Sequence, residues 1–319
     1  MPEILGHLTE ALKYNLQKGI QNGKQQGHQL IVASYNNLMK NQEHKVENPK
    51  DAYIVGWCIE LLHAAHIIYD DILDQSISRY GQPCWHQMKN IGLKVFNDAI
   101  IFDKSLFLLM RLHLGTKDYY AKLMELFQEV ALVTSYGQHM DLTYSRLPPT
   151  EFNVDMYKTT TDTKVAYCGF YLPSVAAMYM AGIKNPLAYD FTRQISLDMG
   201  HLFQAQNDWM DCFGHPERTG KPSSDIEGGK CTWLATECMQ RANPKQKQIM
   251  VECYGKKDSE KSQRVKDLYK TLDLPNVYAA FEKKTLEAIR KRIQQASKEV
   301  PGEVMLQTLN TIYQQAQYT

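Results

Sequence analysis

The order of apolar and polar residues predicts helices along almost the whole chain. Long segments place apolar residues at positions i, i+3, i+4 and i+7, which is the spacing of one helix face, and none sustains the period of two that is typical of a strand. Most of the 12 prolines fall where this pattern breaks, between the predicted helices. Pro173 instead lies inside the apolar segment 155–181, where we expect it to kink the helix. The pattern therefore predicts an all-α fold.

Differences among the predicted helices indicate how they are arranged. Residues 52–74 and 191–213 are apolar on nearly every face, which is typical of helices at the centre of a bundle. Residues 256–270 and 281–298 carry charges on most turns and are expected at the periphery. The chain contains no repeat, low-complexity tract or linker-like stretch. We therefore expect a single domain that covers residues 1–319.

The composition excludes several classes of protein. Lys and Arg number 36 and Asp and Glu 35, so the net charge of +1 provides no basic surface for nucleic acid or an anionic membrane. Seven scattered cysteines without a C-x-x-C pair indicate free thiols rather than disulfides or a zinc site. No uninterrupted apolar run reaches the ~20 residues of a membrane span, and the N-terminus lacks a signal-peptide core. We expect a cytoplasmic protein with no membrane or nucleic-acid partner.

Each of the two central segments ends in a cluster of acidic and amide side chains. The first cluster contains Asp70, Asp71 and Asp74, and the second contains Asn207, Asp208 and Asp211. Residues four apart lie on one helix face, so each cluster presents two oxygen donors in one direction. A D-D-x-x-D sequence most often marks a solvated helix end. Here, however, both clusters follow apolar runs and are built alike, as expected of opposite walls of one site.

Basic residues follow each cluster at short intervals. Arg79 follows the first cluster, and Lys221 and Lys230 follow the second. Carboxylates are unfavourable on a buried helix unless they share a cation, and magnesium prefers oxygen ligands from a few carboxylates and phosphate groups. The combination of carboxylates, a divalent metal and basic side chains predicts a magnesium-dependent diphosphate site.

Four segments of the chain resemble the farnesyl diphosphate synthases of the trans-isoprenyl diphosphate synthase family. They are DDILDQSISRYGQPCW at residues 70–85, FYLPSVAAMYMAGI at 170–183, FQAQNDWMDCFG at 203–214 and TGKPSSDIEGGKCTW at 219–233. The likeness extends from about residue 12 to residue 313, and the segments occur in the family's order. The resemblance implies an isoprenoid synthase fold, in which a single-domain bundle of about ten core helices surrounds a deep central cavity. It also implies a homodimer.

The resemblance further implies roles for individual residues. Three Mg²⁺ ions would be held by the two clusters, whose members are Asp70, Asp71, Asp74, Asn207, Asp208 and Asp211. All of these except Asp71, together with Lys164, would be the catalytic residues. The prenyl diphosphate would be bound by Arg79, Lys164, Lys221, Lys230, Gln204, Gln138 and Lys24. Asp141 and Asp225 match further polar positions that line the site.

Three regions differ from the chain-elongating members of the family. Those members bind a second substrate, isopentenyl diphosphate, with a glutamine and two arginines at positions that here are His63, Gly27 and Tyr80. The loss of two charge-assisted hydrogen bonds costs roughly 3 to 6 kcal/mol of binding free energy. The family's basic C-terminal tail is replaced by the uncharged residues 314–319. In addition, Asn207 gives the second cluster the N-D-x-x-D pattern of terpene synthases derived from farnesyl diphosphate synthases.

These differences lead to a main hypothesis and two alternatives. The main hypothesis is a terpene synthase, a carbon–oxygen lyase that ionises an allylic prenyl diphosphate, preferably farnesyl diphosphate, and cyclises the cation to a sesquiterpene hydrocarbon or alcohol. The first alternative is a short-chain prenyltransferase that condenses isopentenyl diphosphate with an allylic diphosphate to give farnesyl or geranyl diphosphate. The second alternative is a regulatory subunit that keeps the fold without the chemistry. The retained metal and diphosphate residues argue against this last hypothesis.

Overall fold

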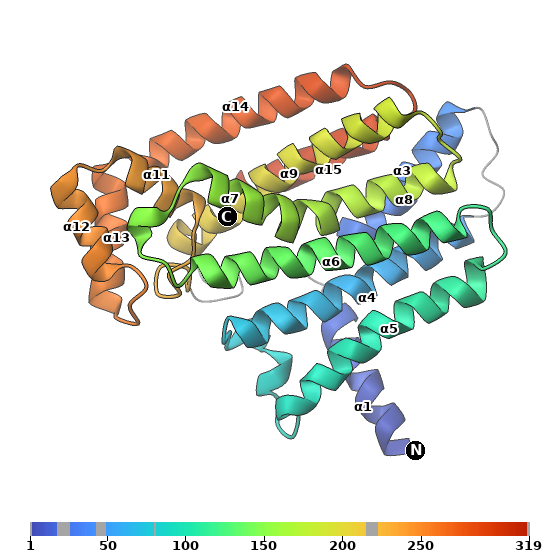
Figure 1. The fold of residues 1–319 in the computed structure, drawn as a ribbon, viewed down its shortest axis with the longest axis horizontal. Helices are drawn as coiled ribbons and strands as arrows, with labels where there is room; N and C mark the ends of the chain where they lie inside the picture. Colours follow the sequence, from blue (N-terminus) through green and yellow to red (C-terminus); the bar gives the residue numbers. More distant parts are fainter. Residues whose placement is uncertain (1, 18–25, 43–48, 80, 215–222, 318–319) are drawn as a thin grey trace.

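Helices make up most of the structure (Figure 1). The computed structural model describes residues 2–17, 26–42, 49–79, 81–214 and 223–317. The α-helices are α1 (Pro2–Leu12), α3 (Gln26–Asn41), α4 (Lys50–Leu73), α5 (Val95–Leu114), α6 (Tyr120–Tyr144), α7 (Val154–Thr161), α8 (Leu172–Met180), α9 (Pro186–Phe213), α11 (Trp233–Arg241), α12 (Pro244–Cys253), α13 (Ser259–Thr271), α14 (Leu274–Gln294) and α15 (Gly302–Gln317). The π-helices are η1 (Lys13–Gln17) and η5 (Asp162–Tyr171), and the 3₁₀ turns are η2 (Trp85–Gln87), η3 (Gly92–Lys94) and η4 (Pro149–Glu151).

A small hairpin is the only β-structure among the described residues. Its strands β1 (Ser78–Arg79) and β2 (Gln82–Pro83) pair antiparallel, with Ser78 opposite Pro83 and Arg79 opposite Gln82. Strands of two residues are too short to show an alternating pattern in the sequence, so the hairpin was not predicted. The all-α prediction is otherwise confirmed.

The centre of the bundle is α4, which packs against α3, α5, α6 and α8. Its residues Val55, Ile59 and Leu62 are completely buried, and burial of each such side chain stabilises the fold by roughly 1.5 to 3 kcal/mol. A second apolar cluster, which includes Trp233 and Tyr269, lies among α11, α12, α13 and α14. Only a few residues of α13 are buried. The central position of residues 52–74 and the peripheral position of residues 256–270 are therefore confirmed, whereas residues 281–298 bury Leu286, Ile289 and Ile293 in the main core.

The helical segment from α7 to α8 contains a π-helix in its middle. This π-helix, η5, ends directly before α8, and Pro173 lies in the first turn of α8. Proline has no backbone N–H, so the carbonyl that would pair with it in a regular helix needs another donor. A wider π turn shifts the pairing by one residue and removes that conflict. The helix is therefore interrupted by a π-helix directly before the proline, and the kink itself stays a prediction.

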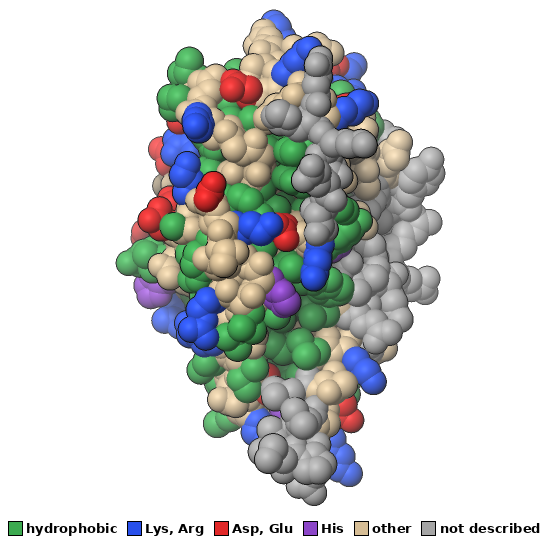
Figure 2. All heavy atoms as spheres, turned by 90° about the vertical axis from the view of Figure 1, so that its right-hand side faces the viewer, with side chains coloured by type: hydrophobic (Ala, Val, Ile, Leu, Met, Phe, Trp, Pro, Cys, Tyr) green, Lys and Arg blue, Asp and Glu red, His purple; other side chains and the backbone are tan. Residues whose placement is uncertain are grey.

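The surface carries charges of both signs. On the face shown in Figure 2, basic and acidic side chains are interspersed with apolar ones, as expected from a net charge of +1. Within the described part of the chain, α4 is long and apolar enough by composition to span a membrane, which a search for uninterrupted apolar runs misses. However, 61% of its apolar 18-residue window is buried inside the bundle. This burial is typical of the core helix of a globular protein.

His201 of α9 is a half-buried histidine whose titration should affect stability. Its ring lies 5.3 Å from that of Tyr157 and 5.9 Å from that of Phe281, and burial together with the nearby Lys158 charge lowers its pKa to about 4. Between pH 4 and 6.5 the unfolded chain therefore binds more protons than the folded chain, so stability is complete above pH 6.5 and falls as the pH drops. We expect His201 to account for about 2 to 3 kcal/mol of the acid-induced loss.

The variant His201→Gln tests this expectation. Urea unfolding at pH 7 and at pH 4.5 should show a smaller loss of stability for the variant than for the wild-type protein. Equal losses in the two proteins would show that His201 does not carry this effect.

Candidate active site

The C-terminal ends of α4, α6 and α9 lie together at one end of the bundle (Figure 1). Each end carries an acidic residue: Asp74 directly follows α4, and the last turns of α6 and α9 contain Asp141 and Asp211. A helix C-terminus carries a partial negative charge, so carboxylates there are unfavourable unless cations balance them. This end of the bundle therefore needs positive partners.

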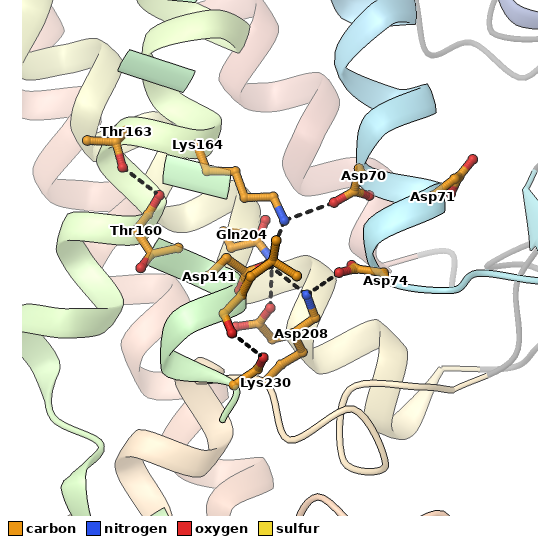
Figure 3. Close-up of polar contacts among 12 residues, drawn as sticks. Asp70, Asp71, Asp74, Asp141, Thr160, Thr163, Lys164, Gln204, Asp208 and Lys230 are labelled. Atoms are coloured by element: carbon orange, nitrogen blue, oxygen red, sulfur yellow. Dashed lines mark hydrogen bonds and ion pairs between the residues drawn. The ribbon is translucent and has the colours of Figure 1, made fainter. Parts of the chain in front are cut away.

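The β1–β2 hairpin returns Arg79 to the carboxylates of α4. Its turn includes Gly81 at φ +71°, a left-handed conformation that glycine adopts without steric cost. Arg79 Nη2 lies 2.9 Å from Asp70 Oδ2 and 2.5 Å from Asp71 Oδ1, and Arg79 Nε donates to the same Asp71 oxygen at 2.9 Å. Asp71 is 5% exposed and points away from the lysines of the site in Figure 3. Arg79 thus fixes Asp71 and reaches Asp70 from outside the helix.

Two lysines from different elements join the remaining carboxylates into one chain of ion pairs (Figure 3). Lys164 Nζ lies 2.9 Å from Asp70 Oδ1 and 2.7 Å from Asp141 Oδ2. Lys230 Nζ lies 2.7 Å from Asp74 Oδ1 and 2.8 Å from Asp141 Oδ2. A single oxygen of Asp141 therefore contacts both ammonium groups. The five side chains are only 13% to 24% exposed, so water screens these pairs weakly.

The ion pairs shift the pKa values of the carboxylates in different directions. Burial alone would raise the pKa of Asp70, but Lys164 and the other nearby cations hold it well below its ordinary value. Burial is likewise outweighed at Asp141, whose pKa is lowered by Lys164 and Lys230. Burial and the neighbouring Asp70 charge raise the pKa of Asp74. Asp70 and Asp141 therefore remain ionised at neutral pH.

Two glycines allow the neighbouring helices to hold Lys164 in place. A Cβ atom on Gly137 of α6 would lie 2.4 Å from the backbone nitrogen of Lys164. A Cβ atom on Gly200 of α9 would lie 2.6 Å from Cα of Ala166. Neither position has room for a side chain, so α6 and α9 approach η5 this closely only because both residues are glycine. This packing, together with the π-helix, determines where Lys164 leaves the helix.

Asp208 of the second cluster is directed into the protein. It is 3% exposed, and its Oδ1 accepts a hydrogen bond from Gln204 Nε2 at 2.7 Å, while its Oδ2 accepts one from the backbone N–H of Trp233 at 2.8 Å. Burial raises its pKa to about 6. Its Oδ2 therefore holds the start of α11, and its Oδ1 is tied to Gln204 one turn earlier in α9. The neighbouring Asn207 is half-buried. The metal role of Asp208 stays a prediction.

Asp211 orders the chain segment that leads to Lys230. Its carboxylate accepts hydrogen bonds from the backbone N–H groups of Ser224 and Asp225, both at 3.1 Å, and from the Ser223 hydroxyl at 3.2 Å. Asp225, which was predicted to line the site, is thus held through its backbone N–H by Asp211. The metal role of Asp211 also stays a prediction.

The other predicted substrate ligands fall into two groups. Lys24 and Lys221 lie outside the described residues. Gln138 of α6 is 8% exposed, and its buried Nε2 group has no hydrogen-bond partner among the described residues. A buried amide donor without a partner is unfavourable, so Gln138 is available to a ligand that brings an acceptor.

Asp141 is the residue whose importance the sequence analysis missed. The sequence indicated only that Asp141 lines the site, whereas the structure makes it the centre of the ion-pair chain. Its partners Lys164 and Lys230 are 23 and 89 residues away along the chain, so no local pattern reveals these contacts. The one available signal is that Gln138 and Asp141 are three residues apart and share a helix face.

Close packing of α3 against α4 fills the space around position 27, where chain-elongating relatives are expected to bind the second substrate with an arginine. A Cβ atom on Gly27 would lie 2.6 Å from Cγ2 of Ile59 and 2.8 Å from Cε1 of His63. Glu60, which is 7% exposed, accepts a hydrogen bond from the backbone N–H of His28 at 2.9 Å. The contact between α3 and α4 therefore has no space for an arginine at position 27. Tyr80 lies outside the described residues.

The oxygen donors at the helix ends fit a hard divalent cation. Asp70 and Asp74 lie one helical turn apart, and carboxylate oxygens are the ligands that Mg²⁺ prefers. Asp70 Oδ1 is buried and lacks a well-directed hydrogen bond, although Lys164 Nζ lies nearby. Across the described ranges, no three His, Cys, Asp or Glu side chains converge to enclose a metal. An ion bound here would take its other ligands from water and from phosphate oxygens, as Mg²⁺ usually does.

An all-helical bundle that gathers carboxylates, lysines and an arginine at the ends of its central helices is typical of enzymes that act on prenyl diphosphates. A family model described as polyprenyl synthetase matches residues 6–272. The chain belongs to this family. Enzymes of the family use Mg²⁺.

Individual relatives agree with this assignment. The chain is 38% identical to a farnesyl pyrophosphate synthase of Murgantia histrionica over 309 residues, which cover 97% of this chain and 76% of the relative. It is 37% identical to that of Mus musculus over 322 residues, which cover 98% and 89% of the two chains. A structure of Trypanosoma brucei farnesyl diphosphate synthase with a bisphosphonate matches with a TM-score of 0.87 and 27% identity, covering 98% of this chain and 90% of that one. The predicted isoprenoid synthase fold is confirmed.

The same comparisons overturn the prediction of a terpene synthase. The relatives that match nearly the whole chain at 37% to 38% identity are farnesyl pyrophosphate synthases, which are prenyltransferases. The prediction of a carbon–oxygen lyase with a cyclic sesquiterpene product is therefore wrong. The prediction was wrong because it was based on the missing arginines at positions 27 and 80. Their absence predicts only weaker binding of a second substrate. Weaker binding alone does not change the reaction.

Proposed function

We propose that this protein is a short-chain prenyltransferase, which condenses isopentenyl diphosphate with an allylic prenyl diphosphate to give farnesyl diphosphate. The observation that carries the proposal is the convergence of Lys164 and Lys230 on Asp70, Asp74 and Asp141 at the ends of three helices. The farnesyl pyrophosphate synthases that match almost the whole chain support the choice of reaction and product length.

The acidic residues of the site would bind metal, and the basic residues would bind the diphosphate. Asp70 and Asp74 would hold Mg²⁺ on one side and Asn207 and Asp211 on the other, with three ions in all. When bound, Mg²⁺ supplies positive charge that favours departure of the diphosphate. Lys164, Lys230 and Arg79 would donate hydrogen bonds to the diphosphate oxygens, which fixes the leaving group in the buried site. The allylic C–O bond would break, the π-bond of isopentenyl diphosphate would form the new C–C bond to the allylic carbon, and the released diphosphate would accept the proton lost from the adduct.

A product assay tests this proposal. The purified protein is incubated with Mg²⁺, isopentenyl diphosphate and either dimethylallyl or geranyl diphosphate, and the dephosphorylated products are identified by mass spectrometry. We expect farnesol from both incubations, with a high KM for isopentenyl diphosphate because positions 27 and 80 lack arginine. The absence of any condensation product at millimolar isopentenyl diphosphate would contradict the proposal.

We also propose that the protein is a homodimer. The exposed side of α5 and α6 provides a surface for the dimer interface. Apolar side chains follow the exposed side of α5 and continue on α6, with exposed fractions of 49% for Ile100, 65% for Leu112 and 57% for Leu132. A row of this kind on neighbouring helices is typical of a protein–protein interface.

We expect the double variant Ile100→Glu, Leu112→Glu to be monomeric, because it would bury two charges in such an interface. Sedimentation velocity measures the change. Leu187→Glu is the matched control, since Leu187 is 73% exposed at the start of α9 and lies outside the α5–α6 row. A double variant that sediments like the wild type would place the interface elsewhere.

The variant Gly137→Ala tests the packing that positions Lys164. The new methyl group would collide with the Lys164 backbone, so we expect about 1 to 3 kcal/mol of lost stability and a roughly ten- to hundredfold lower kcat/KM for the allylic diphosphate. Gly169→Ala in the same π-helix is the control, because no atom lies within 4 Å of its added Cβ. Equal kinetics for the two variants would rule out this positioning role.

A further inference from the structure

The ion-pair chain places two lysines on the oxygens that are proposed to hold metal. Lys164 Nζ lies between Asp70 Oδ1 and Asp141 Oδ2, and Lys230 Nζ lies between Asp74 Oδ1 and the same Asp141 oxygen (Figure 3). Each ammonium group thus has one partner at the C-terminal end of α4, where metal ligands are expected, and one on α6. Asp141 is the partner that the two lysines share.

An ammonium group and a divalent ion compete for the same carboxylate. Two positive charges on one small group of oxygens repel each other strongly in a site that water screens weakly. Asp70 and Asp74 therefore favour one kind of cation at a time. Without any cation, these carboxylates at the negative end of a buried helix would be strongly unfavourable.

We propose that Lys164 and Lys230 act as internal substitutes for the metal ions, and that Asp141 is the positioning residue that keeps both ammonium groups at the site once the carboxylates of α4 bind metal. The inference rests on the metal and diphosphate site of the proposed function. In this exchange the lysines leave α4 but keep their contact with Asp141, and their free N–H groups face the incoming diphosphate. Metal and diphosphate therefore promote each other's binding.

Binding measurements without any prenyl substrate test the exchange. Mg²⁺ alone and inorganic pyrophosphate in saturating Mg²⁺ are titrated into the protein in a calorimeter. Lys230→Met should bind Mg²⁺ roughly tenfold more tightly, because one competing charge-assisted bond is gone, and should bind pyrophosphate roughly tenfold more weakly. Lys164→Met should behave in the same way.

Lys257→Met is the matched control for the loss of a positive charge. Lys257 Nζ lies 3.5 Å from Gln75 Oε1, close to the end of α4, without a carboxylate partner in the described structure. If Lys230→Met binds Mg²⁺ no more tightly than Lys257→Met does, the lysines do not substitute for metal and the inference is overturned.

Asp141→Asn tests the positioning role of Asp141. A simple charge effect and a positioning role predict opposite changes in pyrophosphate affinity. Removal of a negative charge by itself strengthens the binding of an anion, whereas loss of the shared partner of both lysines weakens it. We expect pyrophosphate affinity to fall several-fold, and an increase would refute the role of Asp141. Because no prenyl substrate is used, these outcomes are independent of whether the protein forms farnesyl diphosphate. Circular dichroism of each variant verifies that it is folded.

Discussion

Replacement of Asp70 with alanine is expected to lower kcat/KM for the condensation by at least about a thousandfold, which corresponds to roughly 4 kcal/mol of lost transition-state stabilisation. Asp70 is half-buried beside Lys164 and Arg79, and these cations keep its pKa well below its ordinary value. It therefore offers a permanent negative charge to a metal ion at neutral pH. Its carboxylate contacts both Lys164 and Arg79.

The control for Asp70→Ala is Asp267→Ala, which removes an exposed carboxylate of α13 whose partners Lys270 and Gln263 lie in the same helix. Initial rates with geranyl and isopentenyl diphosphates at several Mg²⁺ concentrations measure both variants. An Asp70→Ala enzyme within tenfold of the wild type at every Mg²⁺ concentration would show that the first acidic cluster does not hold the catalytic metal. It would also favour the alternative that the protein is a regulatory subunit, which keeps the fold without the catalytic activity.

Lys164→Ala is expected to lower kcat/KM for the allylic diphosphate by about a hundredfold or more. One cation that meets the diphosphate is lost, and charge-assisted contacts of this kind are worth roughly 1.5 to 3 kcal/mol in a buried site. The variant also leaves Asp70 and Asp141 with less positive charge, so we expect it to unfold more easily. Lys164→Arg keeps the charge and should recover part of the activity.

The matched control is Lys158→Ala, because Lys158 lies in α7, one to two turns before Lys164, and is exposed to solvent. Steady-state kinetics at 15 °C, below the unfolding transition of each variant, separates lost function from lost stability. If Lys164→Ala and Lys158→Ala have the same kcat/KM, the ion-pair chain contributes nothing to substrate binding.

The sequence was sufficient to predict the fold and much of the site. Helical periodicity correctly predicts the helices, and the nearly all-apolar segment at residues 52–74 becomes the central helix α4. The basic residues Arg79, Lys164 and Lys230 do meet the acidic residues at the end of α4. These successes rest on local patterns and on a resemblance that spans most of the chain.

Long-range contacts could not be predicted in the same way. The central position of Asp141 depends on two lysines from other elements, and the close approach of Gly137 to Lys164 depends on how α6 packs against η5. The inward direction of Asp208 is set by the start of α11. The reaction class was predicted wrongly because a change in binding strength at Gly27 was interpreted as a change in chemistry.

The central claim is that the ends of three helices form one site for Mg²⁺ and diphosphate. The most direct test is the anomalous scattering of Mn²⁺, used in place of Mg²⁺, in a crystal grown with inorganic pyrophosphate. We expect anomalous peaks within coordination distance of Asp70 and Asp74, with pyrophosphate oxygens and the Lys164 and Lys230 ammonium groups beside them. Ordered Mn²⁺ and pyrophosphate bound elsewhere, with both lysines still paired to the α4 carboxylates, would contradict the account.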